Sequence, residues 1–220
     1  SSLAGAADTI LLDRLAHASL LDGARLSGAR LRVFKHNDVN DLKQILDREK
    51  SRRCLVVIES LYSMDGDTPP LAEIVRVTRA SGALLLVDEA HATGVLGATG
   101  RGGLEDIVAA EGALPSQIVA IGTLSKALGS QGGYLCASRT IVDTLIHAGR
   151  AFMFSTALAP AAAAAALAAL QLVDCEPERR HHLLAISARL RVTLEKWKLK
   201  MLPSAGPIIP IIAGDERRAI

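Results

Sequence analysis

Apolar and polar residues alternate along the first two thirds of the chain in two different rhythms. Short apolar runs bounded by polar residues or glycine predict buried strands. Six such runs occur, at residues 9–12, 31–34, 54–59, 83–88, 118–122 and 134–137. Between them, apolar residues recur every three or four positions, which predicts helices at residues 20–26, 39–50, 71–80 and 140–148. Strands that alternate with helices predict an α/β fold, in which helices cover both faces of a mostly parallel central sheet.

The last third has a different pattern. Two long helical stretches, at residues 160–173 and 180–200, are followed by a proline- and glycine-containing turn at 203–207 and an apolar run at 208–212 that predicts a strand. We therefore expect residues 1–175 to form a large domain and residues 176–220 to begin a smaller C-terminal α/β domain. The chain has no initiator methionine and stops within a segment that the pattern continues, so we expect a fragment.

Composition narrows the class of protein. Half of the 220 residues are apolar, and the net charge of +2 gives no general attraction to nucleic acid or to anionic membranes. The longest apolar run, residues 157–170, is too short for a membrane span and predicts a buried helix. Three widely spaced cysteines without a CxxC motif indicate reduced thiols and a cytoplasmic protein. No cluster of histidine, cysteine and acidic residues has convincing metal-ligand spacing.

The candidate chemistry follows four of the predicted strands. In open α/β sheets, ligands bind at the carboxyl ends of the strands, where these side chains should gather. Six polar residues occupy such positions: His17, Ser63, Asp88, His91, Thr123 and Lys126.

Lys126 is the most informative of them, because it stands in an apolar segment flanked by hydroxyls and glycines. A partly desolvated amine can lose its proton and attack an aldehyde. The hydroxyls of Thr123 and Ser125 and nearby backbone N–H groups can hold a phosphate. Asp88 can pair with a pyridine nitrogen. Pyridoxal phosphate (PLP) combines an aldehyde, a phosphate and a pyridine ring, and is the predicted cofactor.

Each residue also has an ordinary structural interpretation. Asp88 could cap the end of a strand, Lys126 could be a surface lysine, and His91 could bind a backbone carbonyl. His17 could start a helix and Ser63 could be a turn hydroxyl, while residues 152–156 could be no more than a helix cap with an apolar contact. The joint arrangement favours the chemical interpretation.

Two alternatives belong to other functional classes. Residues 87–91 spell the acidic box of DEAH helicases, but no lysine follows a glycine, as a phosphate-binding loop requires. A non-catalytic subunit that keeps the fold is the second alternative. Such a subunit would be expected to lack the reactive lysine, so the presence of Lys126 favours an enzyme.

Five motifs resemble those of the α-oxoamine synthases, PLP enzymes of the aspartate aminotransferase fold type. They span nearly the whole chain in the family's order. The motifs are Asp13-Arg14-Leu15-Ala16-His17-Ala18-Ser19, Tyr62-Ser63-Met64-Asp65-Gly66-Asp67, Asp88-Glu89-Ala90-His91-Ala92-Thr93-Gly94, Gly100-Arg101-Gly102 and Thr123-Leu124-Ser125-Lys126-Ala127-Leu128-Gly129.

The resemblance implies a reaction in which an acyl-CoA condenses with an amino acid and releases CO₂ and CoA. The expected pair is pimeloyl-CoA, or a pimeloyl acyl carrier protein thioester, with L-alanine, as in biotin synthesis. Glycine C-acetyltransferase chemistry, or that of another α-oxoamine synthase, is the alternative within the family.

The resemblance also assigns roles to individual residues. Lys126 would bind the PLP aldehyde and later remove the Cα proton, and Asp88 would keep the pyridine nitrogen protonated. His91 and Ser63 would bind the phenolic oxygen of the ring, while His17 would stack on the ring near the reacting carbonyl. Thr123 would contact the phosphate.

Assembly and completeness are further implications of the resemblance. Thr156, together with Ser155, would reach the phosphate bound by the other subunit of a homodimer. A glycine-rich segment that belongs before residue 1 and an arginine that belongs after residue 220 are expected to complete the site.

Overall fold

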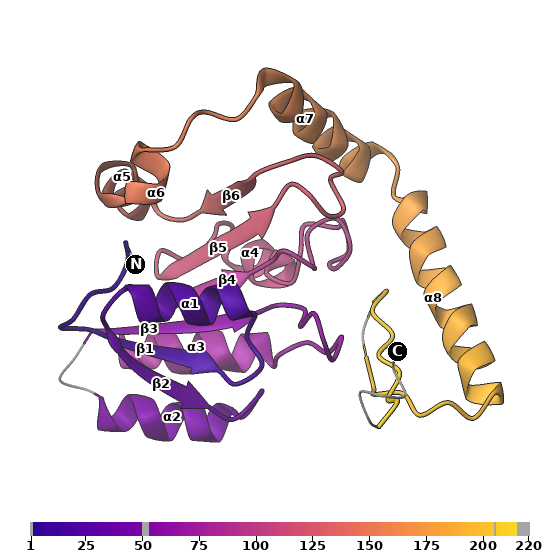
Figure 1. Cartoon of the computed structure of the whole chain (residues 1–220), viewed down its shortest axis with the longest axis horizontal. Coiled ribbons are helices and arrows are strands. Elements are labelled where there is room, and N and C mark those ends of the chain that lie inside the picture. Colours follow the sequence, from indigo (N-terminus) through magenta and orange to yellow (C-terminus); the bar gives the residue numbers. More distant parts are fainter. Residues whose placement is uncertain (1, 50–52, 205, 215–220) are drawn as a thin grey trace.

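The computed structural model describes residues 2–49, 53–204 and 206–214 (Figure 1). Within these segments six strands form one sheet in the order β2-β1-β3-β4-β5-β6. Neighbouring strands from β2 to β5 are parallel and β6 is antiparallel to β5, which confirms the mostly parallel sheet. The strands are β1 (Thr9–Asp13), β2 (Arg30–Phe34), β3 (Cys54–Glu59), β4 (Leu84–Asp88), β5 (Ile118–Thr123) and β6 (Gly133–Cys136).

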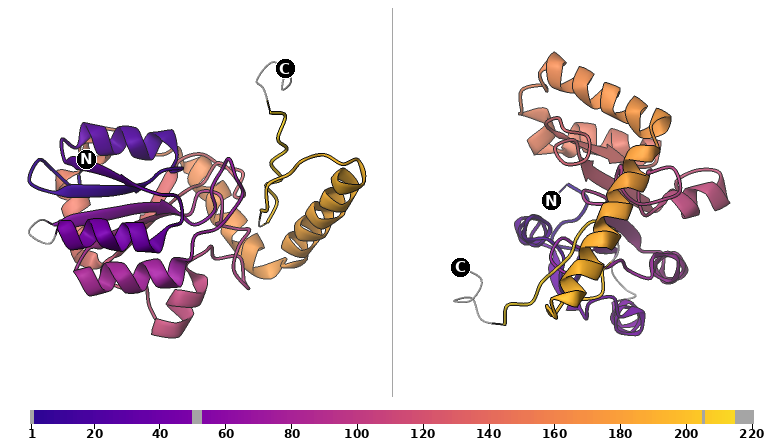
Figure 2. Two further views of the ribbon diagram at one scale, coloured as in Figure 1. Left: turned by 90° about the horizontal axis from the view of Figure 1, so that it is seen from below. Right: turned by 90° about the vertical axis from the view of Figure 1, so that its right-hand side faces the viewer.

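Helices lie on both faces of this sheet. In the two further views, α1 lies over one face while α2 and α3 lie over the other (Figure 2). The helices are α1 (Ala18–Leu26), α2 (Val39–Arg48), α3 (Leu71–Ser81), α4 (Glu105–Glu111), α5 (Arg139–Ala148), α6 (Arg150–Met153), α7 (Pro160–Cys175) and α8 (Glu178–Lys196). None of them, within the described segments, is both long enough and apolar enough to cross a membrane.

The core has two layers because successive strand residues point to opposite faces. Leu11, Val56 and Val87 belong to the layer that includes residues of α2 and α3, whereas Leu12 and Val57 belong to the layer under α1. Both layers are apolar, so the central strands are buried on both sides. The polar side chains that follow the parallel strands therefore emerge together at the carboxyl end of the sheet.

Local signals explain where several elements begin and end. Asp38 caps α2, as its position before an amphipathic stretch predicts, and its side chain accepts a hydrogen bond from the backbone N–H of Asp41 at 2.9 Å. The helix ends at Arg48, two residues before the predicted end at Lys50, which lies outside the described residues. Gly82 ends α3 with a φ of 71°, a left-handed conformation that glycine adopts without strain.

In the second half of the chain two expectations are wrong, and not every helix was predicted. The predicted strand at 208–212 is absent from the described residues: only an isolated bridge joins Ile211 to Met201, and Pro210 removes a backbone donor from the run. Sequence analysis missed α4, which is short and has no fully buried residue. The helix predicted to be buried is α7, yet within the described chain only Ala166 of this helix is buried.

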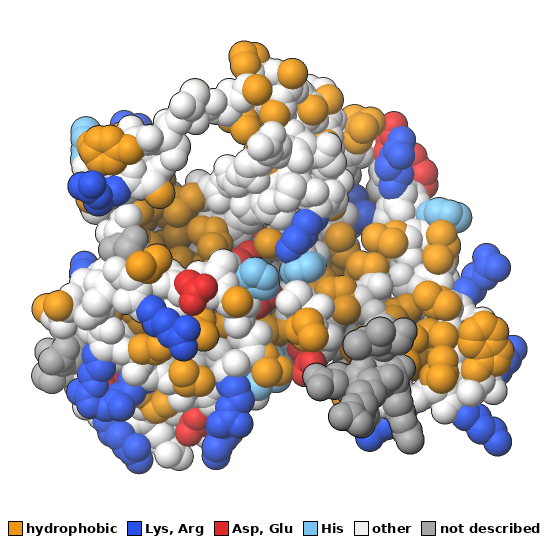
Figure 3. Space-filling model, viewed as in Figure 1, with side chains coloured by type: hydrophobic (Ala, Val, Ile, Leu, Met, Phe, Trp, Pro, Cys, Tyr) orange, Lys and Arg blue, Asp and Glu red, His pale blue; other side chains and the backbone are white. Residues whose placement is uncertain are grey.

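The exposed side chains of α7 and α8 explain that last difference. Both helices lie outside the layers that cover the sheet. Apolar side chains are exposed on their surfaces in the space-filling view (Figure 3). Leu167 is 60% exposed and Leu190 is 45% exposed. An apolar sequence predicts that a helix face will be covered, but it does not say which part of the molecule covers it.

Candidate active site

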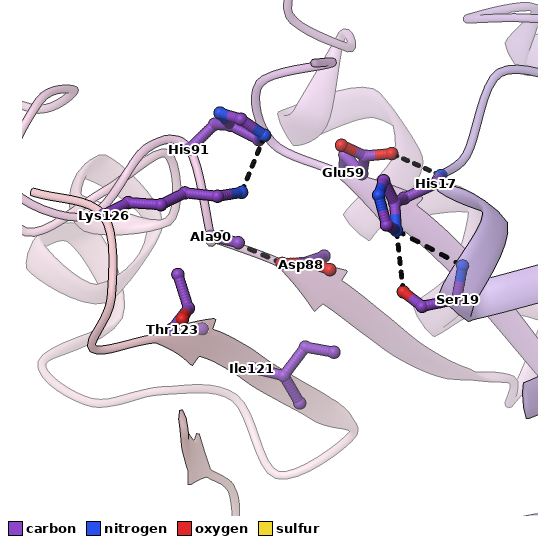
Figure 4. A pocket seen from close by; sticks show the side chains of 10 residues that line it. His17, Ser19, Glu59, Asp88, Ala90, His91, Ile121, Thr123 and Lys126 are labelled. Carbon is purple, nitrogen blue, oxygen red and sulfur yellow. Dashed lines mark hydrogen bonds between the residues drawn. The ribbon is translucent and has the colours of Figure 1, made fainter. Parts of the chain in front are cut away.

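A cavity of about 320 Å³ opens at the carboxyl end of the sheet (Figure 4). Its floor is a row of paired residues on three adjacent strands, because Glu59 is in register with Asp88 and Asp88 is in register with Ile121. Side chains from the loops after β1, β4 and β5 form its walls. The lining residues are His17, Ser19, Glu59, Asp88, Ala90, His91, Ile121, Gly122, Thr123 and Lys126.

Lys126 enters the cavity from the loop after β5. Backbone hydrogen bonds from Leu124 to Gly132 at 2.9 Å and from Ser130 to Leu124 at 2.8 Å fix this loop. The Nζ atom of Lys126 lies 2.7 Å from Nε2 of His91. Burial and the nearby Lys126 charge lower the pKa of His91, although Asp88 opposes the shift. A neutral imidazole can accept a hydrogen bond from the lysine, and the contact holds the amine inside the cavity.

Asp88 lies at the centre of the floor, between the Lys126 side and the His17 side (Figure 4). Its Oδ1 atom accepts a hydrogen bond from the backbone N–H of Ala90 at 2.8 Å, which fixes the carboxylate at the end of β4. Within the described chain, Oδ2 makes no hydrogen bond. One carboxylate oxygen is therefore available to a cationic donor placed in the cavity.

Glu59 is a site residue that sequence analysis missed. It is only 2% exposed, and its Oε1 atom accepts a hydrogen bond from the backbone N–H of His17 at 2.6 Å. Burial raises the pKa of Glu59 to about 7. The His17 N–H and the Lys126 charge oppose the rise, and the charge of Asp88 adds to it. The available signal was its place at the end of a buried strand, which parallel pairing puts beside Asp88.

His17 has both of the roles that the sequence allows. It caps α1, and its Nδ1 atom accepts from the backbone N–H of Ser19 at 3.2 Å. The Ser19 hydroxyl lies 2.8 Å from the same nitrogen. The exposed imidazole also lines the cavity, so starting a helix and facing a ligand are compatible.

The remaining predicted site residues divide into two groups. Thr123 lines the cavity, and its hydroxyl lies 2.7 Å from that of Ser125. Ser63 and Thr156 do not line the cavity. The backbone N–H of Ser63 faces Glu59 and favours its charged form, while Thr156 is exposed. The structure thus brings together His17, Asp88, His91, Thr123 and Lys126. No group of three metal-ligating side chains occurs in the described residues.

A second buried carboxylate, next to Asp88 in the sequence, connects the segments around the site. Glu89 is 3% exposed and accepts hydrogen bonds from the backbone N–H groups of Gly103 at 2.8 Å and Leu104 at 2.9 Å. The Ser60 hydroxyl donates a third at 2.9 Å. Burial raises the pKa of Glu89. This acidic residue of the 87–91 motif therefore joins the ends of β3 and β4 to the loop before α4.

Comparison with known proteins gives the class to which this site belongs. Residues 2–219 match the family model of aminotransferase class I and II. The chain belongs to this family. The family and its solved relatives identify PLP as the cofactor.

Individual relatives narrow the comparison. The chain is 44% identical to an 8-amino-7-oxononanoate synthase from Anaeromyxobacter dehalogenans, over all of this chain and 54% of that protein. It is similar to a solved serine palmitoyltransferase from S. paucimobilis with a bound PLP–myriocin aldimine, with a TM-score of 0.90, 33% identity and coverage of 99% and 56%. It is also similar to a solved 8-amino-7-oxononanoate synthase from Francisella tularensis, with a TM-score of 0.80 and 28% identity. That match covers 96% of this chain and 60% of the other. The chain spans about half the length of the curated relatives it matches.

The residues present fit this cofactor. A cavity of about 320 Å³ is within the range of small-molecule sites. It presents the amine of Lys126, a carboxylate oxygen of Asp88 with no hydrogen bond in the described chain, and the hydroxyl of Thr123. These groups match the aldehyde, the pyridine nitrogen and the phosphate of PLP respectively.

Proposed function

We propose that the whole protein is a PLP-dependent acyltransferase that condenses an acyl-CoA with an amino acid and releases CO₂ and CoA. The proposed substrates are pimeloyl-CoA, or the corresponding acyl carrier protein thioester, and L-alanine. The product is then 8-amino-7-oxononanoate, a precursor in biotin biosynthesis. One observation carries the chemistry: Lys126 and Asp88 line the same cavity at the carboxyl end of the sheet. The relatives named 8-amino-7-oxononanoate synthase support the choice of substrates.

When bound, PLP withdraws electrons from the amino-acid carbon attached to it. Lys126 would hold the cofactor, and its Nζ atom would then take the proton from the substrate Cα. Asp88 would keep a proton on the pyridine nitrogen through its Oδ2 atom. A neutral His91 would accept a hydrogen bond from Lys126 and hold its amine beside the substrate.

The residues around this pair would orient the reactants. His91 and Ser63 would bind the phenolic oxygen of the ring, and Thr123 would bind the phosphate. His17 would lie against the ring and near the acyl carbonyl. Placing reacting groups in this way lowers the entropic cost of reaction.

We further propose that the whole protein is a homodimer in which Thr156 and Ser155 serve the phosphate site of the partner. Residues 176–220 would begin the second, smaller domain. The apolar side chains exposed on α7 and α8 favour burial against further protein surface.

A second candidate uses the same chemistry on other substrates. The solved serine palmitoyltransferases favour a different acyl chain and amino acid, since one from Sphingomonas wittichii has a TM-score of 0.86 and 36% identity. Activity of the whole protein with a panel of acyl-CoAs and amino acids separates the two candidates. We expect the largest kcat/KM for pimeloyl-CoA with L-alanine.

Borohydride reduction tests the chemistry itself. Reduction of the PLP-loaded protein followed by peptide mapping should place a pyridoxyl group on Lys126. A label on another lysine would show that the site is misassigned. Absence of any label from the whole protein would favour the non-catalytic alternative.

A further inference from the structure

The turn between β1 and α1 is held at two points. At its start, Asp13 accepts a hydrogen bond through Oδ1 from the backbone N–H of Leu15 at 2.8 Å, and the carbonyl of Asp13 accepts one from Ala16 at 3.1 Å. At its end, the backbone N–H of His17 donates to Glu59 at 2.6 Å. The second contact joins residues 42 positions apart in sequence and connects the turn to the neighbouring strand.

The ring of His17 has little other support. The residue is exposed, and the described contacts of its ring are those with Ser19, two residues further along the chain. A local cap fixes the ring relative to α1 but not relative to the sheet that carries Asp88. The carboxylate of Glu59 is buried at the end of β3, in register with Asp88. Its hydrogen bond with the His17 backbone therefore fixes His17 relative to the sheet.

We propose that Glu59 is a positioning residue that fixes His17 relative to Asp88 by accepting the hydrogen bond from the His17 backbone. Its reach, rather than its charge, is the property that matters. The consequence for cofactor and substrate rests on the proposed function, but the tie between Glu59 and His17 does not.

The charged groups around Glu59 explain why reach matters more than charge. Asp88 faces it from β4, Lys126 and His91 face it from the loops after β5 and β4, and His17 faces it from the turn after β1 (Figure 4). Lys126 is bound to His91 and not to Glu59. A neutral amide of the same length could accept from His17 equally well, whereas a shorter carboxylate could not reach it.

Two substitutions separate reach from charge. Glu59→Gln keeps the length and an acceptor oxygen, and Glu59→Asp keeps the charge but shortens the side chain by one carbon. Hydrogen exchange of the His17 amide is measured in the whole protein without PLP. We expect exchange to accelerate at least about tenfold in Glu59→Asp and to stay within about threefold of wild type in Glu59→Gln.

Glu49→Asp is the matched control. Glu49 is also buried, at 6% exposure, and accepts from the Thr9 hydroxyl at 3.1 Å at the other end of β1. Its shortening should lower global stability without selective loss of protection at His17. Wild-type exchange at His17 in Glu59→Asp, or equal acceleration in Glu59→Gln, would overturn the positioning role.

The PLP-loaded whole protein tests the consequence for the site. Glu59→Asp should lower kcat by about tenfold with less change in KM, and should alter the visible circular dichroism of bound PLP. Glu59→Gln should restore both. Unchanged kcat and dichroism in Glu59→Asp would show that the tie does not serve the chemistry. If wild type binds no PLP, the proposed function fails, while hydrogen exchange still decides the tie.

Discussion

Two polar clusters lie at the carboxyl end of the same sheet, and they differ in how their charged groups are paired. In the first, the His36 cluster, the ring of His36 lies between two carboxylates. Its Nδ1 is 2.8 Å from Asp13 and its Nε2 is 2.8 Å from Asp67. In the second, the cavity, Lys126 binds a neutral imidazole. The buried carboxylate of Glu59 accepts hydrogen bonds from backbone N–H groups of the described chain.

Both clusters contain a group with a raised pKa, and the causes are opposite. For His36, burial pushes the pKa down, but hydrogen bonds to Asp13 and Asp67 outweigh burial and raise it. For Glu59, burial itself raises the pKa. The first cluster favours a charged group and stabilises the fold, whereas the second keeps a group near neutrality at a cost to stability. A shifted pKa indicates a reactive site only when its cause is known.

The largest expected effect separates equivalent substitutions in the two clusters. Asp88→Asn in the whole protein should fold but lose activity by about 1,000-fold or more, because an amide cannot keep the pyridine nitrogen protonated. Asp67→Asn, in the other cluster, should cost stability and leave kcat per folded molecule within about threefold, because the Asp67 carboxylate binds His36 and Asn37. Steady-state kinetics after correction for the folded fraction measures both. Near-normal turnover in Asp88→Asn would contradict the role given to Asp88.

Removal of the histidine tests the charge balance of the His36 cluster. The pKa of His36 is raised in the folded state above its ordinary value of 6.5. Its stabilising effect is therefore complete below pH 6.5 and is lost as the pH rises through the folded pKa. We expect His36→Gln to lower the free energy of unfolding by about 2–3 kcal/mol at acidic pH and by less at alkaline pH.

Urea unfolding at two pH values, one on each side of the window, measures this difference. The exposed His147 offers a control, since His147→Gln should change stability little at either pH. Equal destabilisation by His36→Gln at both pH values would show that hydrogen bonding alone, without charge, accounts for the cluster.

Glu59 has the same direction of pH dependence as His36, but substitution of Glu59 should have the opposite effect on stability. Its pKa is about 7 in the folded state against an ordinary 4.5, so the folded protein binds more protons across that window and stability falls as the pH rises through it. Glu59→Gln removes this cost. We expect the substitution to raise the free energy of unfolding at pH above 7 by about 1–2 kcal/mol, with a much smaller effect below pH 4.5. A variant that is less stable than wild type at alkaline pH would contradict the cost assigned to burial.

Much of the fold could be predicted because burial leaves a periodic mark on the sequence. Each predicted strand of the sheet lies within one residue of the observed one. Parallel pairing then implied that residues after different strands would meet, and five predicted site residues do line one cavity. The roles of these residues remain predictions.

The features that the sequence did not predict depend on contacts between residues far apart in the chain. Glu59 ends a strand like many polar residues, and its hydrogen bond with His17, 42 positions away, leaves no mark on the local sequence. The apolar run at 208–212 has strand character but only one bridging partner in the described chain. The mostly exposed α7 is a further example, because an alanine-rich sequence indicates that a helix can be buried but not which surface buries it.

The smallest expected effect concerns a residue that belongs to neither cluster. Thr156 is exposed, and its hydroxyl makes no hydrogen bond within the described chain, whereas the adjacent Ser155 hydroxyl donates to the carbonyl of Ala151 at 2.5 Å. If Thr156 serves the phosphate site of a partner subunit, Thr156→Ala should weaken PLP binding by about 1 kcal/mol, or about fivefold in Kd. Thr156→Ser keeps the hydroxyl and should restore binding. Ser155→Ala should have less effect, because that hydroxyl is already bound to the carbonyl of Ala151 in α6. Equilibrium PLP titration of the whole protein, with ultracentrifugation to establish the dimer, measures these differences. Unchanged affinity in Thr156→Ala, or a monomer that binds PLP with wild-type affinity, would place the phosphate site entirely within one subunit.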